Sequence, residues 1–339
     1  AKQASTPGRN LGSDTARPTK EVGRRRGSYP GSHVGRATRA EPARRAPGRP
    51  DGIRAHEARC ATMGRVTWFE AIVLGIVQGL TEFLPISSSA HLLIVGQLFF
   101  DGRDPGAAFT AVTQIGTESA VIVYFAKDIW RIISRWSLAL VGKVPQSDPD
   151  VRMGWMVIVG SLPIALLGLL FEDAIDSGLR NLWITAAMLA GVAIVLAVAD
   201  RVAKNERTID QLTWKHAISL GFWQALALIP GVSRSGATIS GGLFMGYRRE
   251  VAARYAFLLA VPAVMASGLY KLKDIGADAT AAWGPTLLAT VVAFGIGYVV
   301  IAWLLKYVAS HTFTIFVVYR LALAAVLVGL LATGTIAAT

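Results

Sequence analysis

Residues 75–91 decide the fold of this chain; they read Gly-Ile-Val-Gln-Gly-Leu-Thr-Glu-Phe-Leu-Pro-Ile-Ser-Ser-Ser-Ala-His. The stretch is apolar enough to enter a membrane, yet Pro85 interrupts any helix that runs through it. Six polar or ionisable side chains surround that proline: Gln78, Glu82, Ser87, Ser88, Ser89 and His91. Ionisable groups are costly at membrane depth and are retained where they face a protein interior and act there. We therefore expect a broken helix whose polar groups form a functional site inside a membrane domain.

A second stretch, residues 221–238, repeats this pattern as Gly-Phe-Trp-Gln-Ala-Leu-Ala-Leu-Ile-Pro-Gly-Val-Ser-Arg-Ser-Gly-Ala-Thr. A shift of 146 residues superimposes five identities, and only the proline is displaced, by one position: Gly75 on Gly221, Gln78 on Gln224, Leu80 on Leu226, Ser87 on Ser233 and Ser89 on Ser235. An internal repeat of this kind predicts two related halves, at about residues 66–200 and 212–332.

The composition is that of an integral membrane protein. Of 339 residues, 53% are hydrophobic, and several runs reach spanning length with few charges. The single cysteine, Cys60, excludes a disulfide framework and a thiolate metal cluster. The net charge of +12 is concentrated in residues 1–62, where 14 Lys and Arg face 5 Asp and Glu, so it does not indicate a nucleic-acid partner.

Residues 1–62 are rich in Arg, Pro, Gly and Ala and have no apolar period. Such a segment cannot bury enough surface to fold, so we expect a disordered basic extension. A basic arm that touches anionic headgroups is one interpretation. We favour the other, an upstream extension with the natural start at Met63, so that residues 63–339 form the membrane domain.

Along that domain we expect, in each half, a hairpin that enters and leaves the membrane on one side, followed by three crossings. The hairpins are predicted at 68–100 and 217–247, and the six crossings at 109–125, 153–171, 182–199, 251–270, 284–305 and 313–331, with a charged loop at 127–152. Three crossings are an odd number, so the second half must be inverted relative to the first. The predicted fold is an all-α polytopic membrane protein with two inverted-topology repeats.

The loop charges predict the orientation. One side of this topology carries thirteen Lys and Arg and the other five, which places the first side in the cytoplasm. The first hairpin, with Glu82 and His91, then opens to the extracytoplasmic side.

The second stretch predicts a phosphate site. Pro230 and Gly231 end one helix, and serines beside the start of the next are natural caps. A helix N-terminus with hydroxyls and a guanidinium binds phosphate, and Arg234 can fork onto two phosphate oxygens. The alternative is that Ser233 and Ser235 only cap the helix and Arg234 extends to the headgroups, which its place in the middle of a hairpin disfavours.

The first stretch predicts acid–base chemistry. Gln78 and Glu82 share a helix face, and we expect the hairpin to bring His91 close to Glu82. Glu with His supplies a general acid–base pair or metal ligands, and Ser87, Ser88 and Ser89 supply a nucleophile or phosphate donors. Facing Arg234, this set suggests phosphoryl hydrolysis. Elsewhere, we expect the buried Glu118 and Arg320 to neutralise each other as a structural pair.

Residues 79–91 and 230–238 together resemble the two motifs of the bacitracin-resistance family of undecaprenyl-diphosphate phosphatases, over a length from about Met63 to the C-terminus. The resemblance implies that Glu82 and His91 are catalytic and that Arg234 binds the diphosphate; Ser88, Ser233, Ser235 and Thr238 would line the same pocket. Where the family often has a glutamate, four residues before Glu82, this chain has Gln78, which cannot act as a base and is left to orient substrate or metal.

The resemblance also implies a divalent cation, Mg²⁺ or Ca²⁺, with Glu82 as a candidate ligand. It implies a bacterial plasma-membrane hydrolase that releases phosphate from a C55 lipid diphosphate, recycles the carrier for peptidoglycan synthesis and gives bacitracin resistance. His91 and Ser88 both stay open as the attacking group, and a homodimer is left open.

Two other classes remain. Inverted repeats with broken helices are also a transporter design, so the fold could translocate a lipid phosphate without hydrolysing it. A non-catalytic lipid-binding scaffold is the third reading. Phosphate release by the purified protein separates the three.

Overall fold

The computed structural model describes residues 66–100, 106–171, 175, 181–275 and 282–338. All regular elements in these ranges are helical, apart from one isolated bridge between Arg207 and Tyr247. Five helices are long and apolar enough to cross a membrane, at Pro149–Leu170, Leu182–Val202, Arg249–Asp274, Trp283–Val308 and Thr314–Ala332. The chain is therefore an all-α, multi-pass membrane protein, as predicted. The expectations for residues 1–62 and for Met63 lie outside the described residues.

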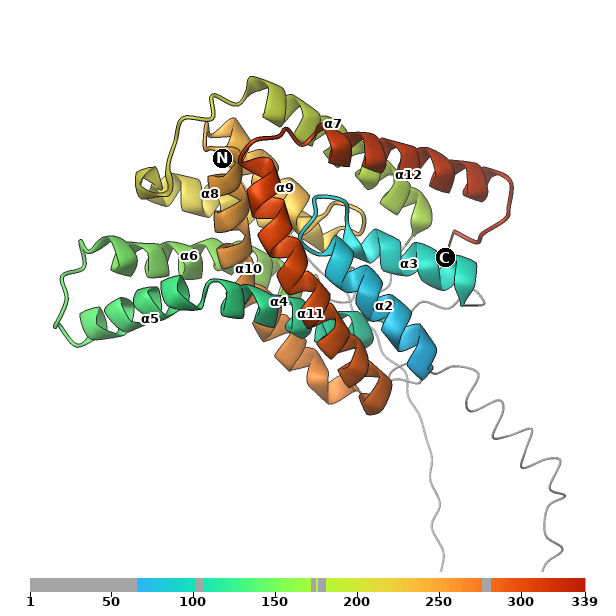
Figure 1. The fold of residues 1–339 in the computed structure, drawn as a ribbon, viewed down its shortest axis with the longest axis horizontal. Helices are drawn as coiled ribbons and strands as arrows, with labels where there is room; N and C mark the ends of the chain where they lie inside the picture. The colour runs from blue at the N-terminus through green and yellow to red at the C-terminus, as the bar shows by residue number, and fades with distance from the viewer. Residues whose placement is uncertain (1–65, 101–105, 172–174, 176–180, 276–281, 339) are drawn as a thin grey trace, which may run out of the picture. The chain divides into compact units, whose positions relative to one another are not determined.

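The first hairpin consists of α2 (Trp68–Thr81) and α3 (Ser88–Phe99) (Figure 1). A capping box starts α2: the Thr67 hydroxyl accepts from the Glu70 N–H, and the Glu70 carboxylate accepts from the Thr67 N–H. The helix ends before Pro85, as the sequence predicts, and the chain turns back into α3 at Ser87.

The second hairpin has the same layout. It consists of α8 (Trp214–Ala225), a 3₁₀ turn at Leu226–Leu228 and α9 (Arg234–Phe244). A threonine cap again begins the first helix, because the Thr213 side chain accepts from the His216 N–H. Every residue of α9 from Ser235 to Leu243 is buried, so the returning helix lies inside the protein rather than against lipid.

The remaining helices are α4 (Ala107–Tyr124), α5 (Ala126–Leu140), α6 (Pro149–Leu170), α7 (Leu182–Val202), α10 (Arg249–Lys271), α11 (Trp283–Val308) and α12 (Thr314–Ala332). The predicted first crossing corresponds to α4, which is not among the five candidate spans. Its sequence includes Thr113, Gln114, Thr117 and Glu118, which lower its hydropathy. The crossing predicted at 109–125 therefore stays a prediction.

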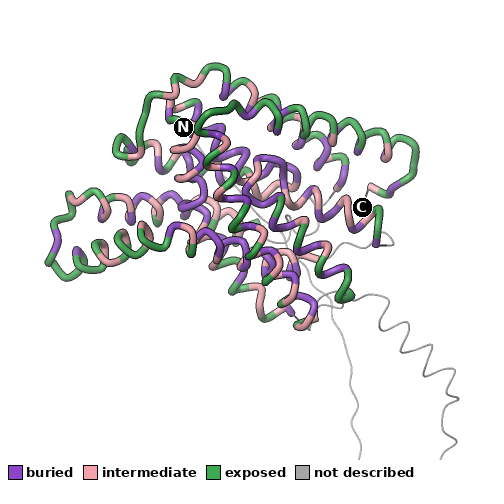
Figure 2. Tube along the Cα trace, in the orientation of Figure 1, coloured by how far each residue is buried: buried purple, intermediate pink, exposed green. Residues whose placement is uncertain are grey.

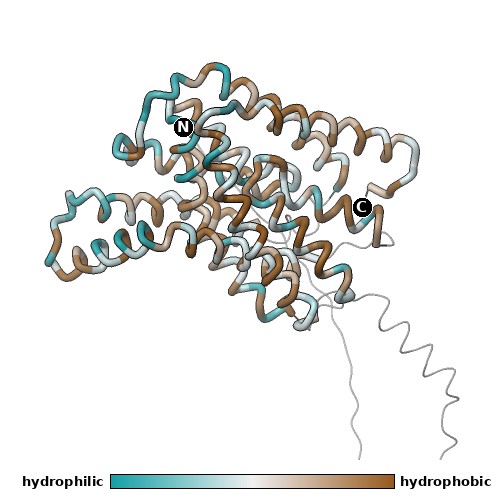
Figure 3. Tube along the Cα trace, in the orientation of Figure 1, coloured by the Kyte–Doolittle hydropathy of each residue, from teal (hydrophilic) through white to brown (hydrophobic). Residues whose placement is uncertain are grey.

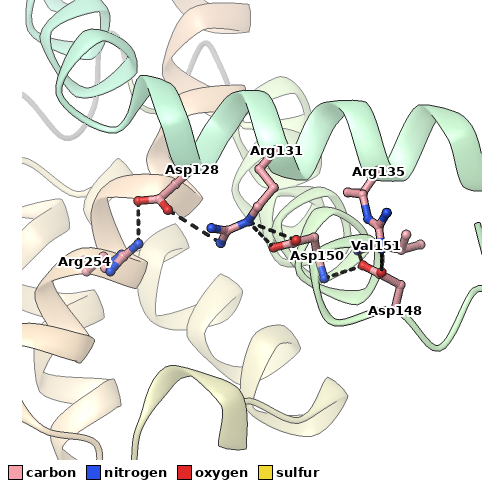
Figure 4. A network of polar contacts seen from close by, with 7 residues as sticks. All are labelled: Asp128, Arg131, Arg135, Asp148, Asp150, Val151 and Arg254. Carbon is pink, nitrogen blue, oxygen red and sulfur yellow. Dashed lines mark hydrogen bonds and ion pairs between the residues drawn. The ribbon is translucent and has the colours of Figure 1, made fainter.

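The charged segment 127–152 was expected to be a loop, and this expectation is wrong. Residues 126–140 form α5, which packs beside α6 with Trp136 edge-on to Trp155 (Figure 1). Its apolar residues recur at helical spacing between the charges, a period that the charge density obscured. Figure 4 shows the polar side of this packing, where Asp128 pairs with Arg254 of α10 and Arg131 pairs with Asp150 of α6.

The two halves pack on each other reciprocally. Helix α2 of the first half lies against α11 of the second, and α8 of the second lies against α6 of the first. At the crossings, a Cβ on Gly75 would overlap the Ala289 carbonyl oxygen, and a Cβ on Gly221 would overlap that of Gly160. Gly75 and Gly221 are the residues that the 146-residue shift superimposes. This reciprocity supports the predicted repeat, while the inverted membrane topology stays a prediction.

The outer faces of the long helices are apolar. Exposed hydrophobic side chains include Ile194 on α7, Val291 and Val299 on α11, and Val318 and Val326 on α12. In Figures 2 and 3 these helices carry exposed positions on stretches that are also hydrophobic. Large apolar surface facing outward is what contact with lipid requires.

Candidate active site

The two returning helices begin with the same unusual backbone. Ser87 and Ser233 have φ values of 74° and 70°, in the left-handed region that non-glycine residues rarely adopt. Each caps its helix, because the Ser87 hydroxyl accepts from the Ala90 N–H and the Ser233 hydroxyl from the Gly236 N–H. Each hydroxyl also meets the serine two residues on, Ser89 at 3.2 Å and Ser235 at 3.1 Å. Two contacts of its own hydroxyl hold each serine in this strained backbone. We therefore treat the two helix breaks, residues 82–87 between α2 and α3 and residues 229–233 before α9, as candidates for function.

Glu82 stands where α2 ends, and it is buried, with 5% of its surface exposed. Its Oε2 accepts from Gln78 Nε2 at 2.7 Å and from Ser88 Oγ at 2.6 Å. Its Oε1 accepts from Arg234 Nη2 at 2.7 Å. One carboxylate therefore joins α2, the start of α3 and the start of α9, which confirms that the two breaks meet.

Arg234 is shared between two carboxylates. Its Nη2 donates to Glu82 and also to Glu118 Oε1 of α4, while its Nη1 has no hydrogen-bond partner among the described residues. Both acidic side chains are almost wholly buried. The expectation that Glu118 neutralises Arg320 is therefore wrong, because the nearer cation for Glu118 is Arg234.

Arg320 is bound by backbone carbonyls instead. It is fully buried, and its guanidinium donates to the carbonyl oxygens of Pro85, Met188, Leu189, Gly231 and Val232. A guanidinium has five N–H groups and no acceptor, so oxygens with spare lone pairs satisfy it without a carboxylate.

His91 bonds to the Ser87 backbone and to Tyr319. Its Nδ1 lies 2.7 Å from the Ser87 carbonyl oxygen and its Nε2 lies 2.7 Å from the Tyr319 hydroxyl, with the two rings nearly parallel. A carbonyl only accepts, so Nδ1 carries the proton, and in the neutral ring Nε2 accepts from Tyr319. Within the described part of the chain neither ring nitrogen is hydrogen bonded to Glu82.

A cavity of about 480 Å³ lies over the two breaks. Beside the two breaks its polar lining comes from Glu82, Ser87, Ser88, Ser89, Gln114, Ser233 and Arg234, and α10 adds Ser267, Tyr270 and Lys271. Its other walls are largely apolar and come mainly from α6 and α10, with Ile164, Leu169 and Val264 among them. A cavity with a charged end and apolar walls is suited to an amphiphilic ligand.

The remaining predicted residues stand just behind this lining. Gln78 is fully buried and holds Glu82, and Ser235 donates to the Leu84 carbonyl oxygen at 3.0 Å, which links the second break to the first. Thr238 is buried, its hydroxyl has no partner among the described residues, and neither Thr238 nor His91 lines the cavity.

Sequence reasoning missed three residues of the site. Glu118 was assigned a structural role, and Gln114 and Tyr319 were not singled out. A signal existed for two of them, because Gln114 and Glu118 repeat on α4 the four-residue spacing of Gln78 and Glu82. Nothing in the sequence marks Tyr319.

The oxygen atoms present fit a hard divalent cation that also binds substrate. Within the described ranges no group of three or more His, Cys, Asp or Glu side chains is gathered, so a closed all-protein metal cage is absent there. Two carboxylates are present, however, and Glu118 Oε2 and Gln78 Oε1 are both buried oxygens with no partner in the described part of the chain. Mg²⁺ is commonly held by one or two carboxylates together with substrate phosphates, which this set matches.

Comparison with known proteins gives consistent matches. Residues 71–326 match the family model described as bacitracin resistance protein BacA. Undecaprenyl-diphosphatase of Pseudarthrobacter chlorophenolicus is 60% identical over 277 residues, which cover 80% of this chain and 100% of the relative. The protein of the same name from Micrococcus luteus is 58% identical with the same coverage. Undecaprenyl-diphosphatase 2 of Streptomyces coelicolor is 54% identical over 283 residues, or 80% of this chain and 97% of the relative.

Proposed function

We propose that this chain, which belongs to the bacitracin resistance protein BacA family, hydrolyses undecaprenyl diphosphate to undecaprenyl phosphate and inorganic phosphate. It is a multi-pass membrane enzyme of the hydrolase class. Its relatives carry that activity in their names, and the cavity has the matching chemistry, with Arg234 and serines at one end and apolar walls beyond them.

One observation carries the assignment of roles. Ser88 Oγ donates to Glu82 Oε2 at 2.6 Å, and Arg234 Nη2 reaches the other oxygen of the same carboxylate. A hydroxyl on a buried carboxylate beside a guanidinium is the arrangement that activates a nucleophile against a phosphate. Ser88 and Arg234 both line the cavity, so both can touch the substrate.

The reaction then has two steps. Ser88 Oγ attacks the distal phosphorus and its proton passes to Glu82, while the bridging P–O bond breaks and the lipid monophosphate leaves as an anion. Water next attacks the phosphoserine and the bond from Ser88 Oγ to phosphorus breaks. Glu82 returns its proton to Ser88 Oγ, and inorganic phosphate leaves with the hydroxyl and the proton of the water. Arg234 exchanges its carboxylates for the phosphate oxygens, and its unpartnered Nη1 supplies the second arm of a fork.

His91 is the rival nucleophile, and its surroundings favour a supporting role. Its Nε2 is occupied by Tyr319 and the residue does not line the cavity. In this proposal His91 fixes the start of α3 through the Ser87 carbonyl, and thereby places Ser88.

A divalent cation, Mg²⁺ or Ca²⁺, is part of the proposal. Glu82 and Glu118 against Arg234 leave these three groups with a net charge of about −1 when both acids are ionised, which by itself repels a diphosphate. The two glutamates and Gln78 Oε1 would hold the cation, and the bound ion would neutralise charge on the phosphate oxygens.

We further propose that the enzyme works in the bacterial plasma membrane with its cavity open to the extracytoplasmic side. The asymmetry of loop charges supports this orientation. Released lipid phosphate would re-enter peptidoglycan synthesis, and removal of the diphosphate form would give bacitracin resistance.

Phosphate release from undecaprenyl diphosphate by the purified protein in detergent tests the function. We expect activity with Mg²⁺ or Ca²⁺, loss of activity on chelation, and a decrease of roughly a thousandfold or more in kcat for Ser88→Ala. Ser119→Ala is the matched control, because the Ser119 hydroxyl donates to the Ile115 carbonyl oxygen of its own helix. A wild-type protein that releases no phosphate but moves the lipid across vesicle membranes would overturn the proposal in favour of a transporter.

A further inference from the structure

Arg320 is the largest fully buried side chain of the described part of the protein, and its bonding is unusual. Five carbonyl oxygens accept from its guanidinium, at distances of 2.8–3.2 Å. No described acidic side chain forms an ion pair with it, although two buried carboxylates lie at the neighbouring site. A buried cation without a charged partner is costly, so its position needs a reason other than stability.

Three of the five carbonyls belong to the two breaks. Arg320 Nη1 donates to Pro85, two residues before the cap Ser87, at 3.1 Å. Its Nη2 donates to Gly231 at 2.8 Å and to Val232 at 3.1 Å, directly before the cap Ser233. One planar group therefore holds segments that are 146 residues apart in the chain.

The planar peptide gives this contact a direction. Because the C=O and N–H of a peptide point in opposite directions, fixing the Val232 carbonyl on Arg320 turns the Ser233 N–H away from Arg320. The first N–H groups of a helix have no partner inside it, and at α9 these belong to the residues around Arg234, which lines the cavity.

We propose that Arg320 is a positioning residue for the hydrolysis: it locks the two breaks in register so that Ser88 and Arg234 face the same phosphate. The inference rests on the proposed function. Arg320 also supplies a positive charge that brings Glu82, Glu118 and Arg234 to a neutral total and so lowers the repulsion of an incoming diphosphate. The role needs a rigid fork of donors, which lysine cannot reproduce.

Kinetics of two variants separate the contribution of the guanidinium fork, which positions the breaks, from the contribution of the positive charge. Arg320→Lys keeps the charge and loses the fork, so we expect kcat to fall about a hundredfold, as for a misplaced reacting group, with KM close to wild type. Arg320→Gln loses both, so KM should rise as well. Arg249→Gln is the control, because Arg249 is a partly buried arginine that pairs with Asp200 between α10 and α7, and neither residue lines the cavity. Its kcat and KM should stay at the wild-type values.

A distance measurement tests the lock without using activity. Leu80 and Leu226 are repeat counterparts, both about half exposed, one in each hairpin. Spin labels on cysteines at these positions, in a Cys60→Ser background, should give a narrow distance distribution in wild type and Arg249→Gln, and a broader or shifted one in Arg320→Lys and Arg320→Gln.

Wild-type kcat in Arg320→Lys, or an unchanged distribution in both Arg320 variants, would overturn the positioning role. An inactive wild type whose label distances nevertheless depend on Arg320 would remove the proposed function and leave the lock in place. The two failures are therefore distinguishable.

Discussion

The first break and the second share a backbone but differ in their side chains. Both begin the returning helix with a serine of positive φ that caps it and contacts the serine two residues on. Between those serines, however, the first break carries Ser88 and the second carries Arg234. The 146-residue shift that relates the two halves pairs the buried acid Glu82 with Leu228.

The residues that the two breaks share build the scaffold, and the residues that differ between them perform the chemistry. Glycines and capping serines recur because two equivalent turns need them, whereas a symmetric pair of acids or of arginines would repel itself. One hairpin supplies the acid and the hydroxyl, the other supplies the cation, and Glu82 bonded to Arg234 joins them.

The largest expected effect comes from the acid that has no counterpart. Glu82→Gln keeps the size of the side chain but removes the base for Ser88 and the charge for Arg234, so kcat should fall by about 10²- to 10⁴-fold. Leu228→Gln places the same amide at the equivalent position of the second hairpin and should cost far less. Steady-state phosphate release measures both variants, and equal losses would show that the difference between the hairpins does not matter.

The two glutamines should respond in opposite ways. Gln78 donates to Glu82, while both amide atoms of the fully buried Gln224 have no partner among the described residues. Gln78→Leu should lose a charged hydrogen bond of about 1.5–3 kcal/mol and lower the activity, whereas Gln224→Leu should leave the free energy of unfolding unchanged or raise it. Thermal unfolding in detergent, together with phosphate release, measures both. A destabilised Gln224→Leu variant would contradict this prediction.

The smallest effects should come from the shared caps, and they should be equal. Ser87→Ala and Ser233→Ala each remove a cap bond and should lower stability by about 1 kcal/mol, while the cost of the left-handed backbone stays, because alanine keeps the Cβ. Glycine at either position accepts that backbone, so Ser87→Gly and Ser233→Gly should be milder than alanine. Chemical unfolding of the four variants provides the test. A loss of stability at one break alone would contradict the structural equivalence of the two breaks.

Sequence reasoning predicted the parts of the site that depend on local pattern. Pro85, the serine caps and the repeat placed both breaks correctly, and the polarity of the two stretches predicted that Glu82 and Arg234 would meet. The helix α5 was missed because its charged residues hid a helical period.

Pairings between distant helices could not be predicted in the same way. Two buried acids and two buried arginines permit more than one pairing, and composition does not choose between them. The structure pairs both acids with Arg234 because Arg320 is already satisfied by carbonyls, and such acceptors exist at every residue and leave no mark in the sequence. The contact of His91 with Tyr319 of α12 could not be predicted either, because it joins side chains of distant helices and no local pattern marks Tyr319.

The most direct test of the account is a structure of the protein with a non-hydrolysable undecaprenyl methylene-diphosphonate. In that complex the guanidinium of Arg234 should leave Glu82 and Glu118 for the terminal phosphonate, and Ser88 Oγ should lie about 3–3.5 Å from its phosphorus, in line with the bridging carbon. A diphosphonate bound away from both breaks, or one that leaves Ser88 out of reach while Arg234 stays on its carboxylates, would contradict it.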